Sequence, residues 1–292
     1  MALVVTARVI AEPEGREASL ELAMQKLAQE GTPVALAELS QHDRDVLHLM
    51  LPGGSARTVA RTLGECFGQC DLLVADGEIE VPQLLVSDMD STMIGQECID
   101  ELADYAGIKP QIAAITERAM RGELDFEGAL RERVALLKGL EEQAISRCLA
   151  ERIRPTPGAK MLVDILKARG CGTVLVTGGF HQFADAVAAD LGFDRVIANG
   201  LGIANGRLTG ELVRAISGPA TKALVLDQER ERLGGNAITL ALGDGANDVP
   251  MLSAATYGIA YCAKPAAEAA ANGFIRRGDL RSVLRLLGVP SG

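Results

Sequence analysis

The residues best suited to chemistry are two aspartates that lie two positions apart, directly after an apolar run. Asp88 and Asp90 belong to the segment Asp88-Met89-Asp90-Ser91-Thr92, which follows the apolar residues 84–86. If that run is a strand of a parallel sheet, both carboxylates lie at its carboxyl end and can face one site. One carboxylate could then attack an electrophile while the other gives a proton to the leaving group. An ordinary polar turn is the alternative interpretation.

A second acidic segment, Gly243-Asp244-Gly245-Ala246-Asn247-Asp248, follows the apolar residues 238–242. A Mg²⁺ ion prefers oxygen ligands and usually keeps waters and a substrate phosphate. Asp88, Asp244 and a main-chain carbonyl of the first loop therefore predict a site for this ion. The chain contains neither a complete GxGxxG nor a GxxxxGK[ST] segment, so nucleotide-binding folds of those types are not supported.

Two weaker features could hold a phosphoryl group. Thr177-Gly178-Gly179 ends a predicted strand at 173–177, where a hydroxyl and backbone N–H groups at a helix entrance can bind phosphate. A tight turn is the alternative for this glycine pair. Lys222 lies in the first turn of a helix predicted after Gly218-Pro219, where a cation opposes the helix dipole. That placement indicates a nearby anion, and a solvated lysine is its alternative.

The elements that must position these residues fall into two units with a boundary near residue 80. Residues 1–80 predict the order βαββαβ, with strands at 3–10, 33–39, 44–50 and 71–75 and amphipathic helices near 20–28 and 59–67. This order is typical of a ferredoxin-like, split-βαβ sandwich. It resembles the ACT-type domains that bind amino acids. A docking or dimerisation unit is an equal alternative, because a fold order alone does not specify function.

Residues 81–292 predict an α/β unit with a parallel, Rossmann-like sheet. Strands at 173–177, 195–198, 237–242 and 257–261 alternate with helical stretches, as crossover connections require. Between 95 and 153 the pattern is continuously helical until Pro155 and Pro157 end it, so we expect an inserted small α-helical cap. Every candidate catalytic residue lies in this second unit.

Composition and charge narrow the class of partner. The 292 residues include 29 Lys and Arg against 39 Asp and Glu, which gives a net charge of −10. An acidic surface repels nucleic-acid phosphates and anionic lipid, so we expect a small-molecule substrate, with no nucleic acid and no membrane partner. No apolar run reaches the ~18 residues of a membrane span, and the start lacks the basic region of a signal peptide, so we expect a cytoplasmic protein. The six scattered cysteines are expected to be reduced and buried.

In this order, DxDxT, a hydroxyl–glycine turn, a lysine and GDGxND resemble the haloacid dehalogenase superfamily of aspartate-nucleophile phosphohydrolases. The match extends from residue 84 to about 283. Six segments closely resemble a family within that superfamily, the phosphoserine phosphatases. They are DMDSTMIGQECIDELA, ERAMRGELDFEGALRERVALLKGL, VTGGF, LTGELV, GDGANDVPML and YCAKP. The resemblance implies Mg²⁺-dependent hydrolysis of O-phospho-L-serine through an aspartyl-phosphate, the last step of L-serine biosynthesis.

The same resemblance implies a role for each candidate residue. Asp88 is implied to be the nucleophile and Asp90 the acid–base group. The residues implied to hold Mg²⁺ are Asp88, Asp90 through its carbonyl, and Asp244, with Asp248 orienting them. The residues implied to hold the phosphate are Thr177, Gly178, Lys222 and Asn247. At Thr177 the family more often has serine, and the hydroxyl is retained.

The helical insertion matches the small cap of that family, at about residues 93–156. Glu97 and Arg133 are implied to hold the serine ammonium and carboxylate groups, with Phe126 beside them. Arg133 is also conspicuous from the sequence, because it lies seven residues after Phe126 in an otherwise apolar helical stripe. An arginine that covers an apolar face with its stem is the alternative. Glu97 taken by itself would be a solvated surface acid.

Three other functions stay open at this stage. A related small-metabolite phosphatase would keep the chemistry and change the substrate, and a phosphotransferase to another amino-acid hydroxyl would keep the chemistry and change the acceptor. A non-catalytic regulator that senses amino acids is a different class of protein, and the intact set of Asp88, Asp90 and Asp244 argues against it. Residues 1–80, as an ACT-like regulatory or dimerisation domain, are compatible with a homodimer and with an amino-acid effector.

Overall fold

A computed structural model describes residues 4–41, 43–213 and 215–290. The strands are β1 (Val5–Ala11), β2 (Leu36–Leu39), β3 (Val46–Leu51), β4 (Cys70–Asp76), β5 (Leu84–Ser87), β6 (Gly172–Phe180), β7 (Arg195–Asn199), β8 (Leu201–Ala204), β9 (Arg207–Leu212), β10 (Thr239–Gly243), β11 (Tyr257–Tyr261) and β12 (Gly273–Ile275). Ten of them form one sheet in the order β2-β3-β1-β4-β12-β11-β10-β5-β6-β7, and β8 and β9 form a separate hairpin.

The half of the sheet from β12 to β7 is parallel throughout. This arrangement confirms the predicted α/β fold with a parallel sheet. β5 and β10 are direct neighbours, with Leu84 opposite Thr239 and Ser87 opposite Leu242. Because the carboxyl ends of parallel neighbours meet at one edge of a sheet, the loops that follow β5 and β10 lie side by side.

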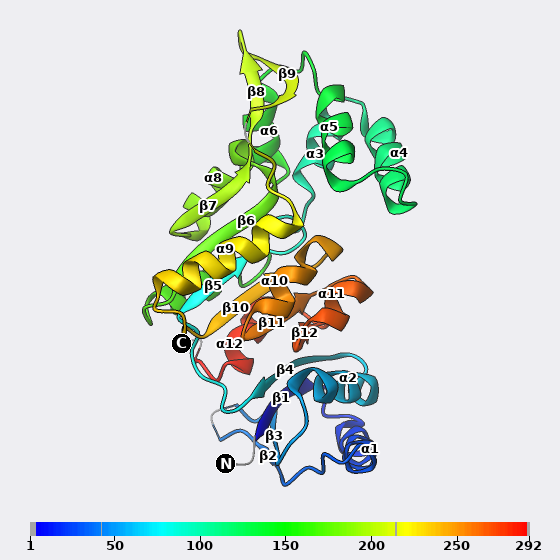
Figure 1. Cartoon of the computed structure of the whole chain (residues 1–292), viewed down its shortest axis with the longest axis vertical. Helices are drawn as coiled ribbons and strands as arrows, with labels where there is room; N and C mark the ends of the chain where they lie inside the picture. The colour runs from blue at the N-terminus through cyan, green and yellow to red at the C-terminus, as the bar shows by residue number, and fades with distance from the viewer. Residues whose placement is uncertain (1–3, 42, 214, 291–292) are drawn as a thin grey trace.

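Helices cover both faces of the sheet and bury two apolar layers. One face is covered by α1 (Arg16–Gln29), α2 (Ala56–Phe67), α9 (Pro219–Arg232), α10 (Val249–Ala254) and α11 (Pro265–Ala270), and the other by α7 (Ala159–Lys167), α8 (His181–Leu191) and α12 (Arg281–Leu286). The alternation of side chains along a strand separates the layers: Leu84 and Val86 pack in one, and Leu85 in the other. Figure 1 shows α9 and α10 across the near face. Within the described ranges, no helix combines the length and the apolar character needed to cross a membrane.

The inserted segment between β5 and α7 is helical, as predicted, and divides into four helices. They are α3 (Cys98–Tyr105), α4 (Lys109–Met120), α5 (Phe126–Leu136) and α6 (Gln143–Glu151). Gly107 and Gly122, both with positive φ, separate the first three. The Asp125 carboxylate caps α5 by accepting from the Gly128 N–H at 2.7 Å. In Figure 1, α3, α4 and α5 form a lobe that overhangs the sheet, and the unpredicted β8–β9 hairpin packs beside α5.

The N-terminal elements have the predicted order βαββαβ, from β1 to β4. Their sheet continues into the rest of the chain, because β4 pairs antiparallel with the short β12, which the sequence did not predict. In addition, α12 packs against β1 and β4. The expected boundary near residue 80 falls in the segment between β4 and β5. Residues 1–80 and 81–292 therefore share one sheet and part of one core, while the resemblance of the first unit to ACT-type domains stays a prediction.

The cysteines are all free thiols, in agreement with the expected reduced state. Four are buried, but Cys66 is half-buried and Cys262 is exposed. The expectation of buried cysteines is therefore wrong for Cys262. This residue directly follows β11, and its N–H donates to the Ile275 carbonyl at 2.8 Å.

Candidate active site

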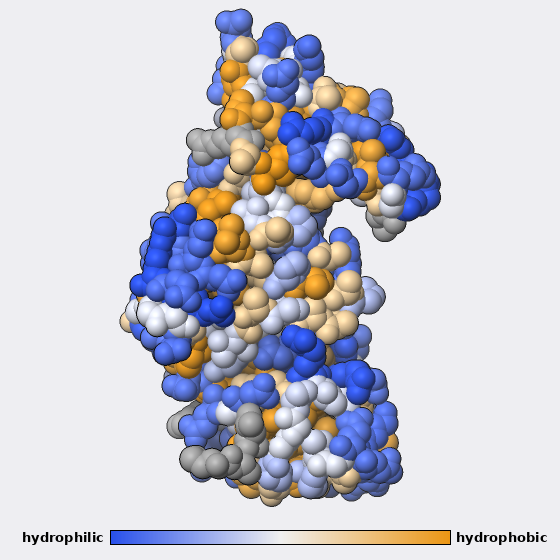
Figure 2. All heavy atoms as spheres, in the orientation of Figure 1, coloured by the Kyte–Doolittle hydropathy of each residue, from blue (hydrophilic) through white to orange (hydrophobic). Residues whose placement is uncertain are grey.

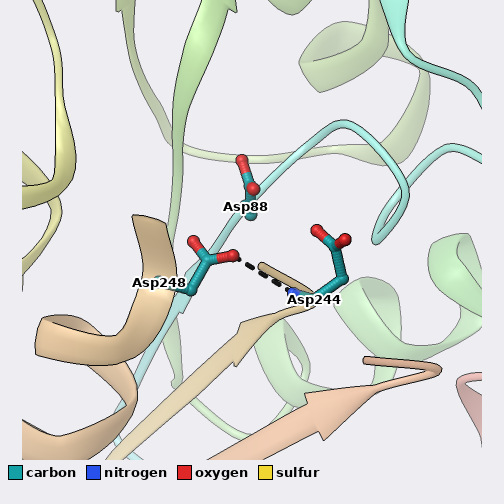
Figure 3. A group of neighbouring side chains, drawn as sticks. All are labelled: Asp88, Asp244 and Asp248. Carbon is teal, nitrogen blue, oxygen red and sulfur yellow. Dashed lines mark hydrogen bonds between the residues drawn. The ribbon is translucent and has the colours of Figure 1, made fainter. Parts of the chain in front are cut away.

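Three aspartates converge at the carboxyl ends of β5 and β10. Asp88 directly follows β5, Asp244 directly follows β10, and Asp248 ends the 3₁₀ turn η1 (Ala246–Asp248). One carboxylate oxygen from each lies within 4.8 Å of the other two, and Figure 3 shows the three carboxylates around a common space. The two acidic loops are thus brought together as predicted. An acidic cluster of this kind could bind a divalent metal ion.

Both carboxylate oxygens of Asp248 accept hydrogen bonds, which fix the orientation of this side chain. Its Oδ2 accepts from the backbone N–H groups of Asp244 at 3.1 Å and Gly245 at 3.0 Å, of which Figure 3 draws the first. Its Oδ1 accepts from Lys222 Nζ at 2.5 Å. A Cβ at Gly243 would lie 2.4 Å from Asp248 Cγ, so the glycine before Asp244 is needed for this close approach.

Lys222 is buried beneath the three aspartates and has only 1% of its surface exposed. Its Nζ lies 2.8 Å from Asp88 Oδ2 and 2.5 Å from Asp248 Oδ1. Burial alone would lower the pKa of Lys222, but the two carboxylates outweigh burial and raise the pKa above its usual value. The alternative of a solvated lysine is therefore wrong, and the predicted nearby anion is confirmed.

The two aspartates of the first loop have raised pKa values. Burial raises the pKa of Asp88 to about 7, against the opposing charge of Lys222. Burial, together with the charges of Glu97 and Asp88, raises the pKa of Asp90 well above its usual value. A carboxyl group whose pKa is raised as far as that of Asp90 keeps its proton near neutral pH and can donate it, whereas Lys222 at 2.8 Å favours the ionised form of Asp88. Asp90 Oδ1 accepts from the Cys98 N–H at 3.4 Å, which orients this group at the start of α3.

Thr177 and Gly178 lie within β6. The start of the next helix, which was expected directly after them, lies a few residues further along the chain. β6 continues to Phe180, and α8 begins only at His181. The Gly179 N–H, expected to be free for a phosphate, donates to the buried Thr177 Oγ1 at 2.9 Å. The hydroxyl and the glycine still face the aspartates across the cavity described next.

A cavity of about 310 Å³ separates the cap from the carboxyl end of the sheet. Its lining includes the predicted residues Asp88, Asp90, Glu97, Phe126, Arg133, Thr177, Gly178, Asp244 and Asn247. Lys222 and Asp248, the remaining two, are buried behind the cavity wall and contact Asp88 and Asp244. Figure 2 shows the surface hollowed beneath the overhanging cap lobe. The structure therefore brings the whole predicted set to one place.

The cap contributes one aromatic and two charged groups to this cavity. The Phe126 ring lies against Gly178 and Gly218, where an added Cβ would lie 3.2 and 3.4 Å from it. Arg133 Nε donates to Ala129 O at 3.3 Å, and its guanidinium forms no ion pair with any residue that the structure describes. Burial lowers the pKa of Arg133. Glu97 accepts from Ser91 Oγ at 2.8 Å.

The comparisons with known proteins place the catalytic segments in one family. Residues 85–253 match the family described as haloacid dehalogenase-like hydrolase. This range is more than half of the chain and includes both aspartate loops, the cap and Lys222. The chain belongs to the haloacid dehalogenase-like hydrolase family.

Relatives of this haloacid dehalogenase-like hydrolase include named phosphatases. The phosphoserine phosphatase of Streptococcus thermophilus is 45% identical over 212 residues, which cover 71% of this chain and 97% of that protein. A phosphoserine phosphatase solved as a phospho-aspartyl intermediate analogue is 36% identical, with a TM-score of 0.65 over 72% of this chain and all of that one. A HAD family hydrolase from Salmonella enterica has a TM-score of 0.81 at 27% identity and covers 97% of this chain and 98% of its own.

Three polar residues of the hydrolase cavity were not predicted from the sequence: Asp100, Thr116 and Lys264. Lys264 lies at the mouth of the cavity, with its Nζ 4.0 Å from Asp244 Oδ2 and its N–H donating to Asp244 O at 2.8 Å. The segment YCAKP could have indicated Lys264, because this lysine follows β11 and so lies at the same edge of the sheet as Asp88 and Asp244. Asp100 and Thr116 could not be singled out from the sequence, because each looks like an ordinary polar residue on the exposed face of a cap helix.

Proposed function

We propose that this chain hydrolyses O-phosphoserine to serine and inorganic phosphate, through a phosphoryl-aspartate formed on Asp88. The observation that carries this proposal is the setting of Asp88. Its carboxylate lines the cavity, pairs with Lys222 at 2.8 Å and has Asp90 two residues away on the same loop. The similarity to phosphoserine phosphatases supports the choice of substrate.

In the first half-reaction a carboxylate oxygen of Asp88 attacks phosphorus. The bond between phosphorus and the serine oxygen breaks, and that oxygen takes a proton from Asp90. The raised pKa of Asp90 favours the protonated form that this step needs. Serine leaves with its hydroxyl restored, and the phosphoryl group stays on Asp88.

In the second half-reaction Asp90 acts as the base. Its carboxylate takes a proton from a water molecule, whose oxygen attacks the phosphorus of the phosphoryl-aspartate. The bond between phosphorus and Asp88 breaks, so inorganic phosphate leaves and both carboxyl groups return to their starting states. Lys222 compensates negative charge next to Asp88 throughout, because it is held there by Asp248.

The donor set fits a Mg²⁺ ion. Three carboxylates lie within 4.8 Å of one another with one buried lysine among them, which leaves an excess of negative charge and hard oxygen donors. The residues that would hold Mg²⁺ are Asp88, Asp90 through its carbonyl, and Asp244. Asp248 would orient this set, because Lys222 and two backbone N–H groups already occupy its oxygens. When bound, Mg²⁺ would neutralise charge on the transferred phosphoryl group.

The remaining cavity residues divide between the two ends of the substrate. The residues that would hold the phosphoryl group are Thr177, Gly178, Lys222 and Asn247. Asn247 Nδ2 already lies 3.5 Å from Asp88 Oδ2. Arg133 and Glu97, on the cap, would hold the carboxylate and ammonium groups of serine, with Phe126 between them and the sheet. Cap and sheet thus recognise different ends of one molecule.

The first 80 residues are proposed to form an ACT-like regulatory or dimerisation unit ahead of the phosphatase unit at 81–292, whose cap spans about 93–156. The order βαββαβ and the four-stranded antiparallel arrangement of β1 to β4 support this division. A homodimer and an amino-acid effector bound by this unit belong to the same proposal.

Phosphate release from a panel of phosphomonoesters, with and without Mg²⁺, tests the function. We expect phosphoserine to be hydrolysed with the highest kcat/KM and the activity to require the ion. Equal efficiency on all esters would contradict the assigned substrate. Added alcohols provide the second arm of the test, because phosphoryl transfer to them in preference to water would identify a phosphotransferase.

A further inference from the structure

We propose that Asn199 is a positioning residue that sets the distance between the two arms of the phosphate site. The first arm is the bulged Thr177–Gly178 segment of β6, and the second is the Ser217–Gly218 segment that leads into α9 and Lys222. This inference rests on the proposed function and deepens it. Asn199 lies at the end of β7 and is 2% exposed.

The first arm needs a partner because β6 departs from regular pairing there. Val176 of β6 is opposite Ile197 of β7, but the next pair is Phe180 with Asn199. Four steps along β6 therefore match two steps along β7, and the intervening residues bulge out of the ladder. The Gly178 carbonyl lies in this bulge and accepts from Asn199 Nδ2 at 2.7 Å. The side chain of Asn199 thus takes the place of a lost ladder hydrogen bond.

The second arm is held by the same amide. Asn199 Oδ1 accepts from the Ser217 N–H at 2.7 Å, and Nδ2 also lies 3.3 Å from the Ser217 carbonyl. Gly218 caps α9, and Lys222 projects from the first turn of that helix onto Asp88. A shift of Ser217 would be transmitted through one helical turn to Lys222 Nζ.

The cap makes contact with both arms at once. The Phe126 ring lies against Gly178 of the first arm and Gly218 of the second. The position of this ring over the cavity therefore depends on the separation that Asn199 maintains. Asn199 itself does not line the cavity and is 21 residues from Gly178 in sequence, so it acts through the groups that do.

Only a short side chain with both a donor and an acceptor satisfies these contacts. Aspartate has the same shape, but an ionised carboxylate cannot donate to the carbonyls of Gly178 and Ser217. Alanine leaves those buried backbone groups without partners. Asn199→Ala and Asn199→Asp should therefore both let the arms separate, with the second change at least as damaging as the first.

Asn272 offers a matched control elsewhere in the chain. Its Nδ2 donates to the carbonyls of Val74 and Thr256, both at 2.9 Å, and its Oδ1 accepts from the Gly258 N–H at 2.7 Å. This is the same pattern of two donated bonds and one accepted bond, at the junction of β4 and β11. Asn272→Ala should reproduce the loss of stability without disturbing the phosphate site.

The test compares the full-length wild type, Asn199→Ala, Asn199→Asp and Asn272→Ala, and Asn199→Asp, which keeps the shape of the side chain, decides the outcome if alanine prevents folding. We measure kcat and KM on phosphoserine and on an aryl phosphate, and the affinity for inorganic phosphate by calorimetry in Mg²⁺. For Asn199→Ala we expect kcat/KM to fall ~10- to 100-fold on both substrates, as for a displacement of about 1 Å. Phosphate affinity should fall in parallel, and Asn272→Ala should stay within about threefold of wild type.

Equal effects of Asn199→Ala and Asn272→Ala at similar melting temperatures would overturn the inference, because the role of Asn199 would then be stability alone. A loss confined to phosphoserine would also overturn it, since the phosphate site serves both substrates. If the wild type hydrolyses no phosphomonoester, the proposed function fails, and the calorimetric comparison still decides whether Asn199 organises an anion site.

Discussion

Lys222 and Asp88 form an ion pair of 2.8 Å that is almost completely removed from solvent. The same ammonium group contacts Asp248 at 2.5 Å, so one cation serves two buried carboxylates. This relationship links the proposed nucleophile, directly after β5, to the first turn of α9, which lies more than 130 residues further along the chain. The charge balance at Asp88 therefore depends on the tertiary fold.

Replacing Lys222 by methionine should both destabilise and inactivate the protein. The change leaves Asp88 and Asp248 buried without their cation, which typically costs about 3–5 kcal/mol. Urea unfolding and phosphate release would measure the two effects. Lys264→Ala is the control for the unfolding measurement alone, because the Lys264 side chain is 73% exposed and should contribute less than about 0.5 kcal/mol to stability. A fully active, stable Lys222→Met variant would refute the role of the pair.

Asp88→Asn should fold like the wild type and lose at least about 1000-fold in kcat, because an amide keeps the shape of the side chain but is not a nucleophile. Circular dichroism and phosphate release would check the two halves of this expectation. Incubation with phosphoserine followed by intact-mass analysis should show a phosphorylated species only for chains that retain Asp88. Near wild-type turnover of the variant would exclude covalent catalysis at this residue.

Arg133→Ala should affect phosphoserine far more than a small aryl phosphate. Loss of a charge-assisted contact to the serine carboxylate in a closed site is worth about 2–4 kcal/mol, or ~30- to 1000-fold in kcat/KM. The aryl phosphate has no carboxylate, so its hydrolysis should change by less than about tenfold.

Arg131→Ala is the matched control on the same helix, α5. Arg131 is 57% exposed and pairs with Glu127 at the surface, so its replacement should leave both substrates unaffected. The ratio of efficiencies on the two substrates would be compared across the three proteins. Equal losses on both substrates in Arg133→Ala would assign Arg133 to the fold or the phosphate.

The ion pair between Asp43, in the loop between β2 and β3, and Arg285 of α12 should weaken in acid. Arg285 Nε lies 2.5 Å from Asp43 Oδ2, and this hydrogen bond holds the pKa of Asp43 below its usual value. A group whose pKa is lowered by folding stabilises the fold above its unfolded pKa of about 3.9, and this contribution disappears as the pH falls through the folded pKa.

Asp43→Asn should therefore lower the melting temperature by up to about 3 °C at pH 7 and by much less near pH 2. Thermal unfolding of wild type and variant at both pH values would check this. Asp164→Asn, which removes the surface pair with Lys160, is the control and should change little at either pH. A difference that persists unchanged at pH 2 would rule out the ion pair as its cause.

Removal of residues 1–80 should leave the catalytic groups in place but lower stability. All proposed catalytic residues lie in 81–292, so phosphatase activity per folded molecule should persist. The truncation exposes the edge of β12 and the surface of α12 that packs against β1 and β4, so a lower melting temperature and aggregation are expected. A folded but inactive truncation would show that the first 80 residues contribute to the site. An unchanged melting temperature would show that the shared sheet adds no stability.

The sequence alone was sufficient to locate both acidic loops. Asp88 and Asp244 each follow an apolar run with strand character, and parallel neighbours end at the same edge of a sheet. The cap was predictable from its helical periodicity, although the positive φ values of Gly107 and Gly122, which divide it into separate helices, were not recognised. These are local signals, carried by spacing and residue type over a few positions.

Only the tertiary structure determined which distant segments meet. Nothing within residues 70–76 specifies that β4 pairs with β12, because that pairing depends on the register of two strands about 200 residues apart. The burial of Lys222 and the placement of Asn199 between two loops have the same origin. The periodicity of apolar residues predicts which side of a helix or strand is buried. Which other segment covers that side depends on the packing of the whole chain.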